Sequence, residues 1–522
     1  MNLGTADILV LVLYFLSQIA IGLYAGRKNR STEHYFLAGK SFSGLVIGIS
    51  FIGSVISSST FLATPADAFK TAWLRFVPNF AFPVVVLLAA WLFIPFFRRG
   101  TVTSAYHYLA LRFGGSISAY ASVVFIVTQL LRTSMIAYLL SLLVGEVTGW
   151  GFAHSLLLIV GVTALYTVKG GIKAVIWTDV AQTFVLLAGG LACVVHAMMH
   201  TPDGIAGIFS DAIIHHKFSF YDLDGTGALA PTKWFGGFSE KTVFMLFLVG
   251  CMQYLNLQFD QSTVQRWCTT KTAGEARKSM YILGFGCLPV WGLFQFTGIC
   301  LFVFFLHHPD PAASGILSGV RKAELILPHF IMNYLPSGLA GLVIAGAFAA
   351  GMSTLSACIN VSGMVVVDDI YKKYINRRAG DSRRLFLGKV FSLGMALSMI
   401  AGALLIYNCS MLTLTDFMLT AGVVITIGIP SVFIAGMFIR RIDTPAIWSG
   451  VLAALVFMFW IMLGNSGRIP EAWRIGMPSY YVSIFGNLLA LAVAVLVSLV
   501  VKPRPRDLAN LTVWDQSRNA LE

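Results

Sequence analysis

Residues 45–69 read LVIGISFIGSVISSSTFLATPADAF, an apolar stretch long enough to cross a bilayer but interrupted at its middle. A membrane span takes roughly 20 mostly apolar residues, and a stable apolar helix would place Leu or Ala at mid-depth. Here the middle runs from Gly53 to Thr60 and consists of glycine, β-branched and hydroxyl residues. We therefore predict a transmembrane helix that is discontinuous at this point.

Apolar stretches of similar length recur along the whole chain, which has 522 residues, 57% of them hydrophobic and 11% charged. A soluble fold cannot bury so much apolar surface, so the composition predicts an all-α polytopic membrane protein. One transmembrane domain is expected over residues 1–505, followed by a short cytoplasmic tail over 506–522. We predict about thirteen spans, near residues 6–25, 45–69, 76–97, 119–147, 155–168, 174–198, 243–265, 280–305, 339–370, 388–407, 412–438, 446–463 and 482–501.

The net charge of +13 is explained by the predicted topology. Of the 36 Lys and Arg residues, 26 fall in joints on one side of the membrane, 9 on the other side, and one, Arg132, within a span. Loops rich in Lys and Arg stay on the cytoplasmic side. The N-terminus is therefore expected outside and the C-terminus inside, in a bacterial inner membrane. The retention of Lys and Arg on the cytoplasmic side of the lipid bilayer accounts for the net positive charge, and no nucleic-acid partner is indicated.

A second interrupted span lies five spans after the first, where residues 253–260 read QYLNLQFD. An inverted repeat of five plus five helices places a broken first helix in each half, with substrate and ions bound where the backbone unwinds. The alternative is that the hydroxyl side chains bond back to their own helices or pack small faces together. We predict a leucine-transporter-like core, with repeats at about 45–198 and 243–438, plus one extra N-terminal and two extra C-terminal helices.

The ninth span contains oxygen atoms that suit a sodium ion. Ala350, Ser353 and Thr354 are related as i, i+3 and i+4, so a carbonyl and two hydroxyls can share one helix face. Carbonyls freed between Gly53 and Ile56 would complete the set. A proton-coupled site would instead require a titratable group, so these neutral oxygens favour sodium. Packing of small residues remains the alternative interpretation of this segment.

Four motifs together resemble the sodium:solute symporter family, in its order and spacing and over most of the chain. They are residues 103–114 (TSAYHYLALRFG), 166–182 (YTVKGGIKAVIWTDVAQ), 260–266 (DQSTVQR) and 353–360 (STLSACIN) followed by Asp368. Within that family the chain is most similar to bacterial sodium/sialic acid symporters and, more distantly, to sodium/galactose symporters. The resemblance implies alternating-access symport with Na⁺ as the co-transported ion, one or two per cycle.

The resemblance also implies site residues. Its sodium site comprises Gly53, Ile56, Ala350, Ser353 and Thr354, the five positions already reached from helix geometry. A second sodium site would use Asp179, Ser353 and Ser356, although Ala357 stands where a further serine is expected. The substrate pocket would be lined by Val55, Ser57, Thr60, Asn79 and Arg132, with Phe61, Phe82, Phe259 and Asp260 as gate or pocket residues.

Arg132 bears on the nature of the substrate. A central Arg in a membrane span costs about 2.5 to 3.5 kcal/mol even on insertion scales, so it normally faces a cavity or an anionic partner. By resemblance it binds a substrate carboxylate. The alternative is a structural ion pair with Asp179 or Asp260.

We expect a sodium-coupled importer of a small polar solute, with a carboxylate-bearing sugar such as sialic acid as the predicted substrate. A neutral sugar or another monocarboxylate is the alternative substrate, and a channel or a transport-like sensor is the alternative class. No enzymatic activity is expected, because the sequence shows no zincin signature, no nucleophile elbow and no intramembrane aspartate pair in a shared motif. The sequence indicates no particular oligomeric state.

Overall fold

The computed structural model describes residues 3–29, 31–98, 104–224, 227–237, 240–408, 428–478, 481–501, 508 and 510–514. Helices dominate, and the single described sheet is one antiparallel pair of short strands. The elements, in chain order, are α1 (Thr5–Ala25), η1 (Gly26–Lys28), α2 (Thr32–Leu37), η2 (Ala38–Lys40), α3 (Gly44–Val55), α4 (Ser58–Lys70), η3 (Trp73–Phe76), α5 (Val77–Leu88), η4 (Ala89–Phe93), α6 (Ile94–Arg98), α7 (Ala105–Phe113), α8 (Gly115–Thr148), α9 (Phe152–Met199), α10 (Gly204–Ile214), β1 (Tyr221–Leu223), β2 (Leu229–Pro231), α11 (Val243–Gln258), α12 (Gln261–Thr269), α13 (Ala273–His307), α14 (Pro311–Leu317), η5 (Ala323–Leu325), α15 (Ile326–Tyr334), α16 (Leu339–Met364), η6 (Val365–Ile375), α17 (Asp381–Asn408), α19 (Ile429–Phe438), α20 (Thr444–Asn465), η7 (Glu471–Trp473) and α21 (Val482–Val500).

Both predicted interruptions are breaks in the structure. The axes of α3 and α4 meet at 59°, and those of α11 and α12 meet at 56°. Within the described residues, nine helices are long and apolar enough to cross a membrane, and the two bent pairs bring the number to eleven. The polytopic all-α architecture is therefore confirmed. The predicted span at 412–438 is described only at its end, in α19, since residues 409–427 lie outside the described part.

The long helix α9 is a hairpin of two helices. Gly171 has a φ of 59° and a ψ of −159°, which no α-helix contains. Tyr166, before this break, donates from Oη to Met352 O of α16 at 3.5 Å, and Gly189, after it, packs against Gly346 of the same helix. A straight helix would separate Tyr166 and Gly189 by about 35 Å, whereas Met352 and Gly346 are six residues apart on α16. The turn at Gly171 matches the boundary predicted between the spans at 155–168 and 174–198.

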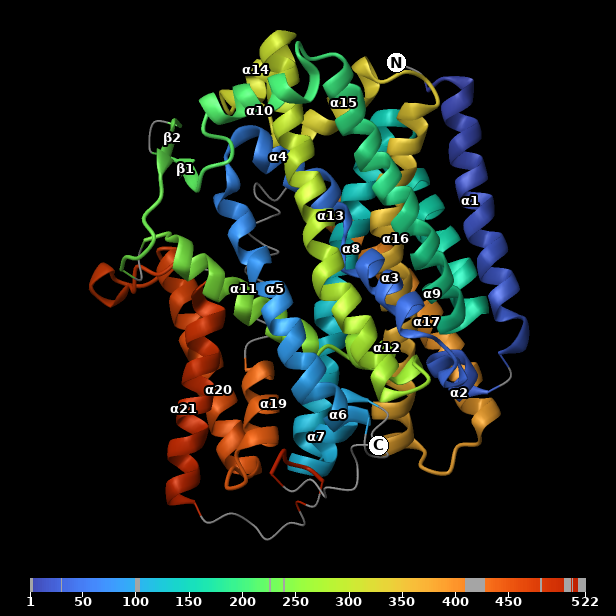
Figure 1. Cartoon of the computed structure of the whole chain (residues 1–522). Coiled ribbons are helices and arrows are strands. Elements are labelled where there is room, and N and C mark those ends of the chain that lie inside the picture. Colours follow the sequence, from blue (N-terminus) through green and yellow to red (C-terminus); the bar gives the residue numbers. More distant parts are fainter. Residues whose placement is uncertain are drawn as a thin grey trace.

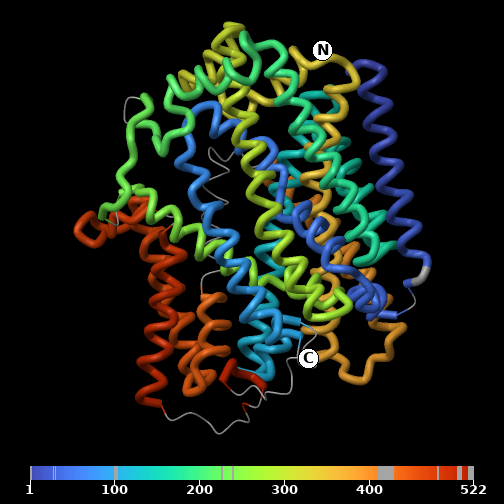
Figure 2. The backbone as a smooth tube through the Cα atoms, in the orientation of Figure 1, coloured from blue at the N-terminus to red at the C-terminus, as the bar shows by residue number. Residues whose placement is uncertain are grey.

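Helix α16 lies at the centre of the bundle and is buried along almost its whole length. It packs against α1, α3, α4, α8, α9 and α17. Helix α1 lies at one edge of the molecule, and α19, α20 and α21 form a group at the opposite side (Figure 2). The connecting helices α10, α14 and α15 gather at the top of Figure 1, whereas α2 and α7 lie at the lower end.

Gly171 offers a test of the hairpin. A Cβ atom at this position would lie 2.6 Å from the carbonyl oxygen of Tyr35, and the positive φ disfavours any L side chain. We predict that Gly171→Ala destabilises the protein by about 1–3 kcal/mol and lowers the apparent Tm of the purified protein by several degrees. Gly161→Ala in the same helix is the control, because a Cβ there meets nothing within 4 Å. Equal Tm values for both variants would contradict the proposed turn.

Candidate transport site

The site begins at the break between α3 and α4. Ile56 and Ser57 have extended backbones, with φ and ψ of −82° and 113° and of −107° and 175°. The last backbone bond of α3 runs from Ile56 N to Ile52 O, at 3.1 Å. The final carbonyls of a helix have no amide partner one turn ahead. The carbonyls of residues 53–56 are therefore left free in the middle of the bundle.

Helix α16 places hydroxyl groups against these freed carbonyls. Ser353 Oγ donates to Gly53 O at 2.8 Å and lies 3.1 Å from Ala350 O. Thr354 Oγ1 lies 3.4 Å from Ser54 O. Four of the five predicted residues thus lie together: Gly53, Ala350, Ser353 and Thr354. The fifth, Ile56, is the residue directly after the end of α3. Carbonyl and hydroxyl oxygens at this spacing are hard, neutral ligands suited to an alkali cation.

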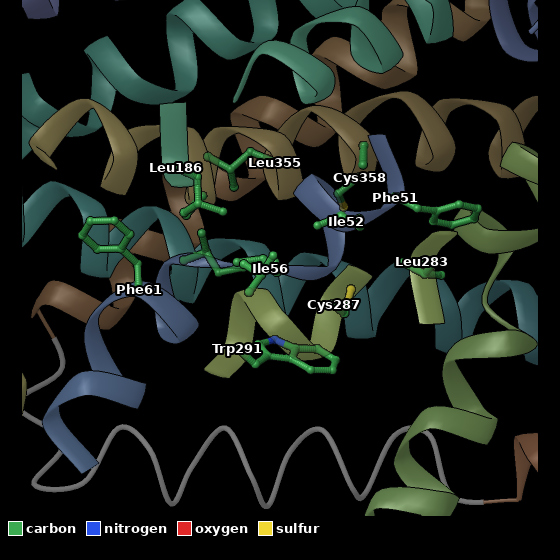
Figure 3. Close-up of a cluster of buried hydrophobic side chains, with 14 of the residues drawn as sticks. Phe51, Ile52, Ile56, Phe61, Leu186, Leu283, Cys287, Trp291, Leu355 and Cys358 are labelled. Carbon is green, nitrogen blue, oxygen red and sulfur yellow. The ribbon is translucent and has the colours of Figure 1, made fainter. Parts of the chain in front are cut away.

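Gly53 allows α3 to approach the second half of α9 closely. A Cβ atom on it would lie 2.4 Å from Thr183 Oγ1 and 2.9 Å from Asp179 O. Figure 3 shows apolar side chains around the break, among them Ile52, Ile56, Leu186, Leu355 and Trp291. Ile56 and Leu355 have no exposed surface. The break thus lies among apolar side chains, and polar interactions are stronger in such surroundings than in water.

Asp179, on the second half of α9, lies directly behind the break. One of its carboxylate oxygens accepts from Arg266 Nη2 at 2.8 Å and from Ser50 Oγ at 2.9 Å. The other oxygen, Oδ1, is buried and has no hydrogen-bond partner among the described residues. Ser356 Oγ donates to the carbonyl of Ser353 at 2.9 Å. The residues expected around a second ion are therefore neighbours of the first group.

Arg266 is a site residue that the sequence interpretation did not assign. It belongs to α12, directly after the second break, and is 2% exposed. Its ion pair with Asp179 joins α12 to α9, and Ser50 of α3 donates to the same carboxylate oxygen. The signal was present in the motif at 260–266, but a pattern of residues does not say which carboxylate lies opposite.

A cavity of about 1670 Å³ opens beside the break. Its wall includes the five predicted substrate residues Val55, Ser57, Thr60, Asn79 and Arg132, together with Phe259 and Asp260. The amides of Gln129, Gln253 and Asn256 also line it, and these were not predicted, although amides within apolar spans are a usable signal.

Arg132 is exposed to this cavity and has no ion pair or hydrogen bond within the described part of the chain. Its two expected structural partners are occupied elsewhere. Asp179 pairs with Arg266, and Asp260 accepts from Gln129 Nε2 at 3.1 Å and from Ser262 N at 2.7 Å. Among the described residues Arg132 forms no ion pair, although Asp260 lies within electrostatic range of its guanidinium.

Phe61 and Phe82 were expected to flank the pocket, but the structure places them behind its wall. Phe61 packs on Phe294 with ring centroids 5.1 Å apart, and Phe82 packs on Tyr254 at 4.6 Å. Both rings are fully buried. Phe82 supports the pocket through Tyr254, whose hydroxyl donates to Asn79 Oδ1 at 2.5 Å. Helical spacing alone could not separate these rings from Phe259, which does line the cavity.

Among the described residues, the lining of the cavity extends to the α14 and α15 end of the bundle. There it includes charged residues, among them the ion-paired Asp67 and Arg75. At the opposite end, polar contacts join the helices: Ser104 Oγ donates to Asp369 Oδ1 at 2.7 Å, and Gln261 Oε1 accepts from Ala105 N at 2.7 Å. The described lining of the cavity thus reaches one face of the bundle.

Two broken helices around a cavity open to one face, with freed carbonyls facing buried hydroxyls, define a secondary transporter that works by alternating access. The model of the sodium:solute symporter family matches residues 35–455. The chain belongs to that family and is a multi-pass membrane transporter that couples a small solute to Na⁺.

Relatives in several organisms are similar to the chain over most of its length. It is 25% identical to the sodium/sialic acid symporter NanT of Aliivibrio fischeri over 508 residues, covering 96% of this chain and 94% of that protein. It is 27% identical to the sodium/sialic acid symporter SiaT of Proteus mirabilis, covering 89% and 91%. It is 26% identical to human sodium-coupled monocarboxylate transporter 1, covering 85% and 71%.

A solved structure has the same fold. A Na⁺-coupled sialic acid symporter in a substrate-bound, outward-open state superposes with a TM-score of 0.84 at 23% identity, over 97% of this chain and all of that one. A nucleobase-cation-symport-1 family transporter matches with a TM-score of 0.52 at 13% identity, over 91% of this chain and 96% of that one. The leucine-transporter-like architecture is therefore shared with Na⁺-coupled symporters.

Removal of one hydroxyl tests the ion-binding role of the break. We predict that Ser353→Ala raises the Na⁺ concentration for half-maximal uptake about tenfold or more, because a contact to a charged group contributes roughly 1.5–3 kcal/mol. Ser362→Ala on the same buried helix is the control and should leave the Na⁺ dependence unchanged. Na⁺-activation curves of uptake in proteoliposomes measure the effect. A shift of the same size in both variants would contradict the assignment.

Proposed function

We propose that the chain imports a carboxylate-bearing sugar, with sialic acid as the leading candidate, together with sodium ions. The observation that carries this proposal is the unpaired guanidinium of Arg132 in the wall of the cavity. An Arg within a membrane helix normally faces a cavity or an anionic partner, and a substrate carboxylate in the cavity would pair with Arg132 in the bidentate geometry that guanidinium groups favour.

The polar groups around Arg132 suit a polyhydroxylated acid. Ser57, Thr60 and Asn79 can exchange hydrogen bonds with sugar hydroxyls, and Gln253 and Asn256 add two amides from α11. The relatives named above are sialic acid symporters and a monocarboxylate transporter. The chemical group common to these substrates is a carboxylate, which supports the role given to Arg132.

We assign the sodium ion to the carbonyls of Gly53, Ile56 and Ala350 and to the hydroxyls of Ser353 and Thr354. A second sodium ion would use Asp179, Ser353 and Ser356. The unpartnered oxygen of Asp179 supports this second assignment, since a buried carboxylate oxygen without a donor is costly unless a cation or water contacts it.

The charge distribution of the sequence supports thirteen spans in a bacterial inner membrane, with the N-terminus outside and the C-terminus in the cytoplasm. With this topology the α14 and α15 end of the molecule faces outward, and the cavity is open to the outside. The contact of Ser104 with Asp369 then belongs to the closed inner gate. Import would require the gate to open after the cavity closes over its solute.

Energetics favour two ions for an anionic substrate. One inward charge at 100 mV contributes about 2.3 kcal/mol, and a tenfold sodium gradient adds about 1.4 kcal/mol. A monoanion carried with one sodium ion cancels the electrical contribution, which leaves roughly tenfold accumulation. A second sodium ion restores the electrical contribution and doubles the chemical one.

We predict that Arg132→Ala lowers the affinity for carboxylate-bearing sugars about tenfold or more, while leaving the binding of a neutral sugar analogue almost unchanged. Arg321→Ala, at the outer part of the same cavity wall, is the matched control. Thermal-shift titrations in sodium buffer measure both ligands. An equal loss for charged and neutral ligands would make Arg132 a structural residue.

The second ion is tested by the Hill coefficient for sodium. We predict a value near two for the wild type and near one for Ser356→Ala, because this variant removes one proposed ligand but keeps the Asp179 to Arg266 ion pair. The same uptake assay at varied Na⁺ gives both values. An unchanged coefficient in the variant would argue against a second site at Ser356.

Substrate selectivity separates the remaining alternatives. Competition by neutral sugars or by short monocarboxylates alone would favour those substrates over sialic acid. A non-saturating, ohmic current would favour a channel, and substrate binding without flux would favour a sensor. The two broken helices around the cavity support a symporter over both of these classes.

A further inference from the structure

A second cavity, of about 730 Å³, lies at the opposite end of the molecule from α14 and α15. It is formed by α2 and η2 on one side, α7 and the start of α8 on another, and η6 with the beginning of α17 on the third. Helices α2 and α7 lie at the lower end of Figure 1. With the topology proposed above, this end faces the cytoplasm.

The lining of this cavity is basic. It includes five Lys or Arg side chains and His107, against three carboxylates. Two of the cations, Lys40 and Lys372, have no hydrogen bond or ion pair within the described residues, and both are exposed. Among the carboxylates, Asp369 is already engaged by Ser104 Oγ and by Lys373 Nζ, each at 2.7 Å. Arg384 pairs with Asp381, which is not in the cavity wall. The remaining cations of the wall are Lys40, Lys372 and Arg377 and the remaining carboxylates are Glu33 and Asp368, so one positive charge is left over.

Apolar side chains flank the same cavity. On η6, Tyr374 is 50% exposed and Ile375, which directly follows it, is 70% exposed. On α17, Phe386 is 65% exposed, two residues after Arg384 of the cavity wall. Exposed aromatic and aliphatic groups beside Lys and Arg are typical of a surface at the boundary between headgroups and acyl chains. A soluble anion bound in the cavity would not require these neighbouring apolar side chains.

We propose that this cavity binds the phosphate headgroup of an anionic phospholipid from the inner leaflet. Lys40, Lys372 and Arg377 contact the phosphate, and the acyl chains pass over Tyr374, Ile375 and Phe386. Basic pockets between membrane helices on the cytoplasmic side are suited to such headgroups. The assignment of the cavity to the inner leaflet rests on the proposed topology, and it does not depend on the identity of the transported solute.

The proposed lipid site lies next to the contacts that we assign to the closed inner gate. Asp369 of the cavity wall accepts from Ser104, and Tyr374 Oη donates to the carbonyl of Gly115 at 2.7 Å. Both contacts join η6 to the region of α7 and α8. A headgroup held by Lys40 and Lys372 bridges η2 and η6 beside these contacts. Lipid binding thus stabilises the closed arrangement of this face.

The test uses a pair of variants with the same change of charge. Lys372→Ala/Arg377→Ala removes two cations from the cavity wall, whereas Arg378→Ala/Arg383→Ala removes two exposed neighbours that do not line it. The purified full-length proteins are titrated with phosphatidylglycerol or phosphatidylcholine, and bound lipid is counted by native mass spectrometry. At about fivefold for each cation, we expect roughly thirtyfold weaker phosphatidylglycerol binding for the cavity variant. The control variant should bind as the wild type does.

Three results would overturn the proposal. Equal weakening in the two double variants would mean that the basic surface acts as a whole, without a site. Equal binding of phosphatidylglycerol and phosphatidylcholine would show that the phosphate charge is not recognised. Displacement of the lipid by inorganic phosphate or glycerol phosphate at low millimolar concentration would make a soluble phosphate the occupant.

Discussion

The break between α3 and α4 is the constraint on which the rest of the structure depends. A helix that ends at Val55, in the middle of the bundle, leaves carbonyl groups that neither lipid nor apolar side chains can satisfy. Helix α16 compensates through Ser353, whose hydroxyl reaches Gly53 O at 2.8 Å. The glycine at position 53 lets the same segment pack closely on α9, where a Cβ atom would lie 2.4 Å from Thr183 Oγ1. We propose that an alkali cation takes the place of the missing amide partners.

Charge within the membrane is arranged around that site. The ion pair of Asp179 and Arg266 lies directly behind the break and joins it to α12, after the second break. Removal of one partner of a buried ion pair typically costs about 3–5 kcal/mol, because the other charge is left uncompensated. Since Asp179 and Asp260 have hydrogen-bond partners within the protein, Arg132 is a cation beside the break that stays available to a solute. We propose that the cavity holds an anion at Arg132 and that the accompanying ions bind at the neighbouring break.

Much of this could be predicted from the sequence, for reasons that differ between elements. Span positions follow from apolar length. The first break follows from Gly, Ser and Thr at mid-depth, and the second from the polar residues of QYLNLQFD five spans later. The convergence of Ala350, Ser353 and Thr354 follows from helical spacing. What could not be predicted is which side chains meet across helices. The partner of Asp179, the burial of Phe61 and Phe82 behind the pocket wall, and the amides of Gln253 and Asn256 depend on helix rotation and packing. Because the helices are apolar on all sides, the spacing of residues along one helix does not indicate which side chains face a neighbouring helix.

The central claim is that solute movement through the cavity is driven by sodium bound at the break. The most direct measurement is uptake of radiolabelled sialic acid into proteoliposomes under an inward Na⁺ gradient, compared with an equal K⁺ gradient and with no gradient. The structural account predicts saturable accumulation above equilibrium with the Na⁺ gradient alone. Uptake of equal extent under all three conditions would contradict it.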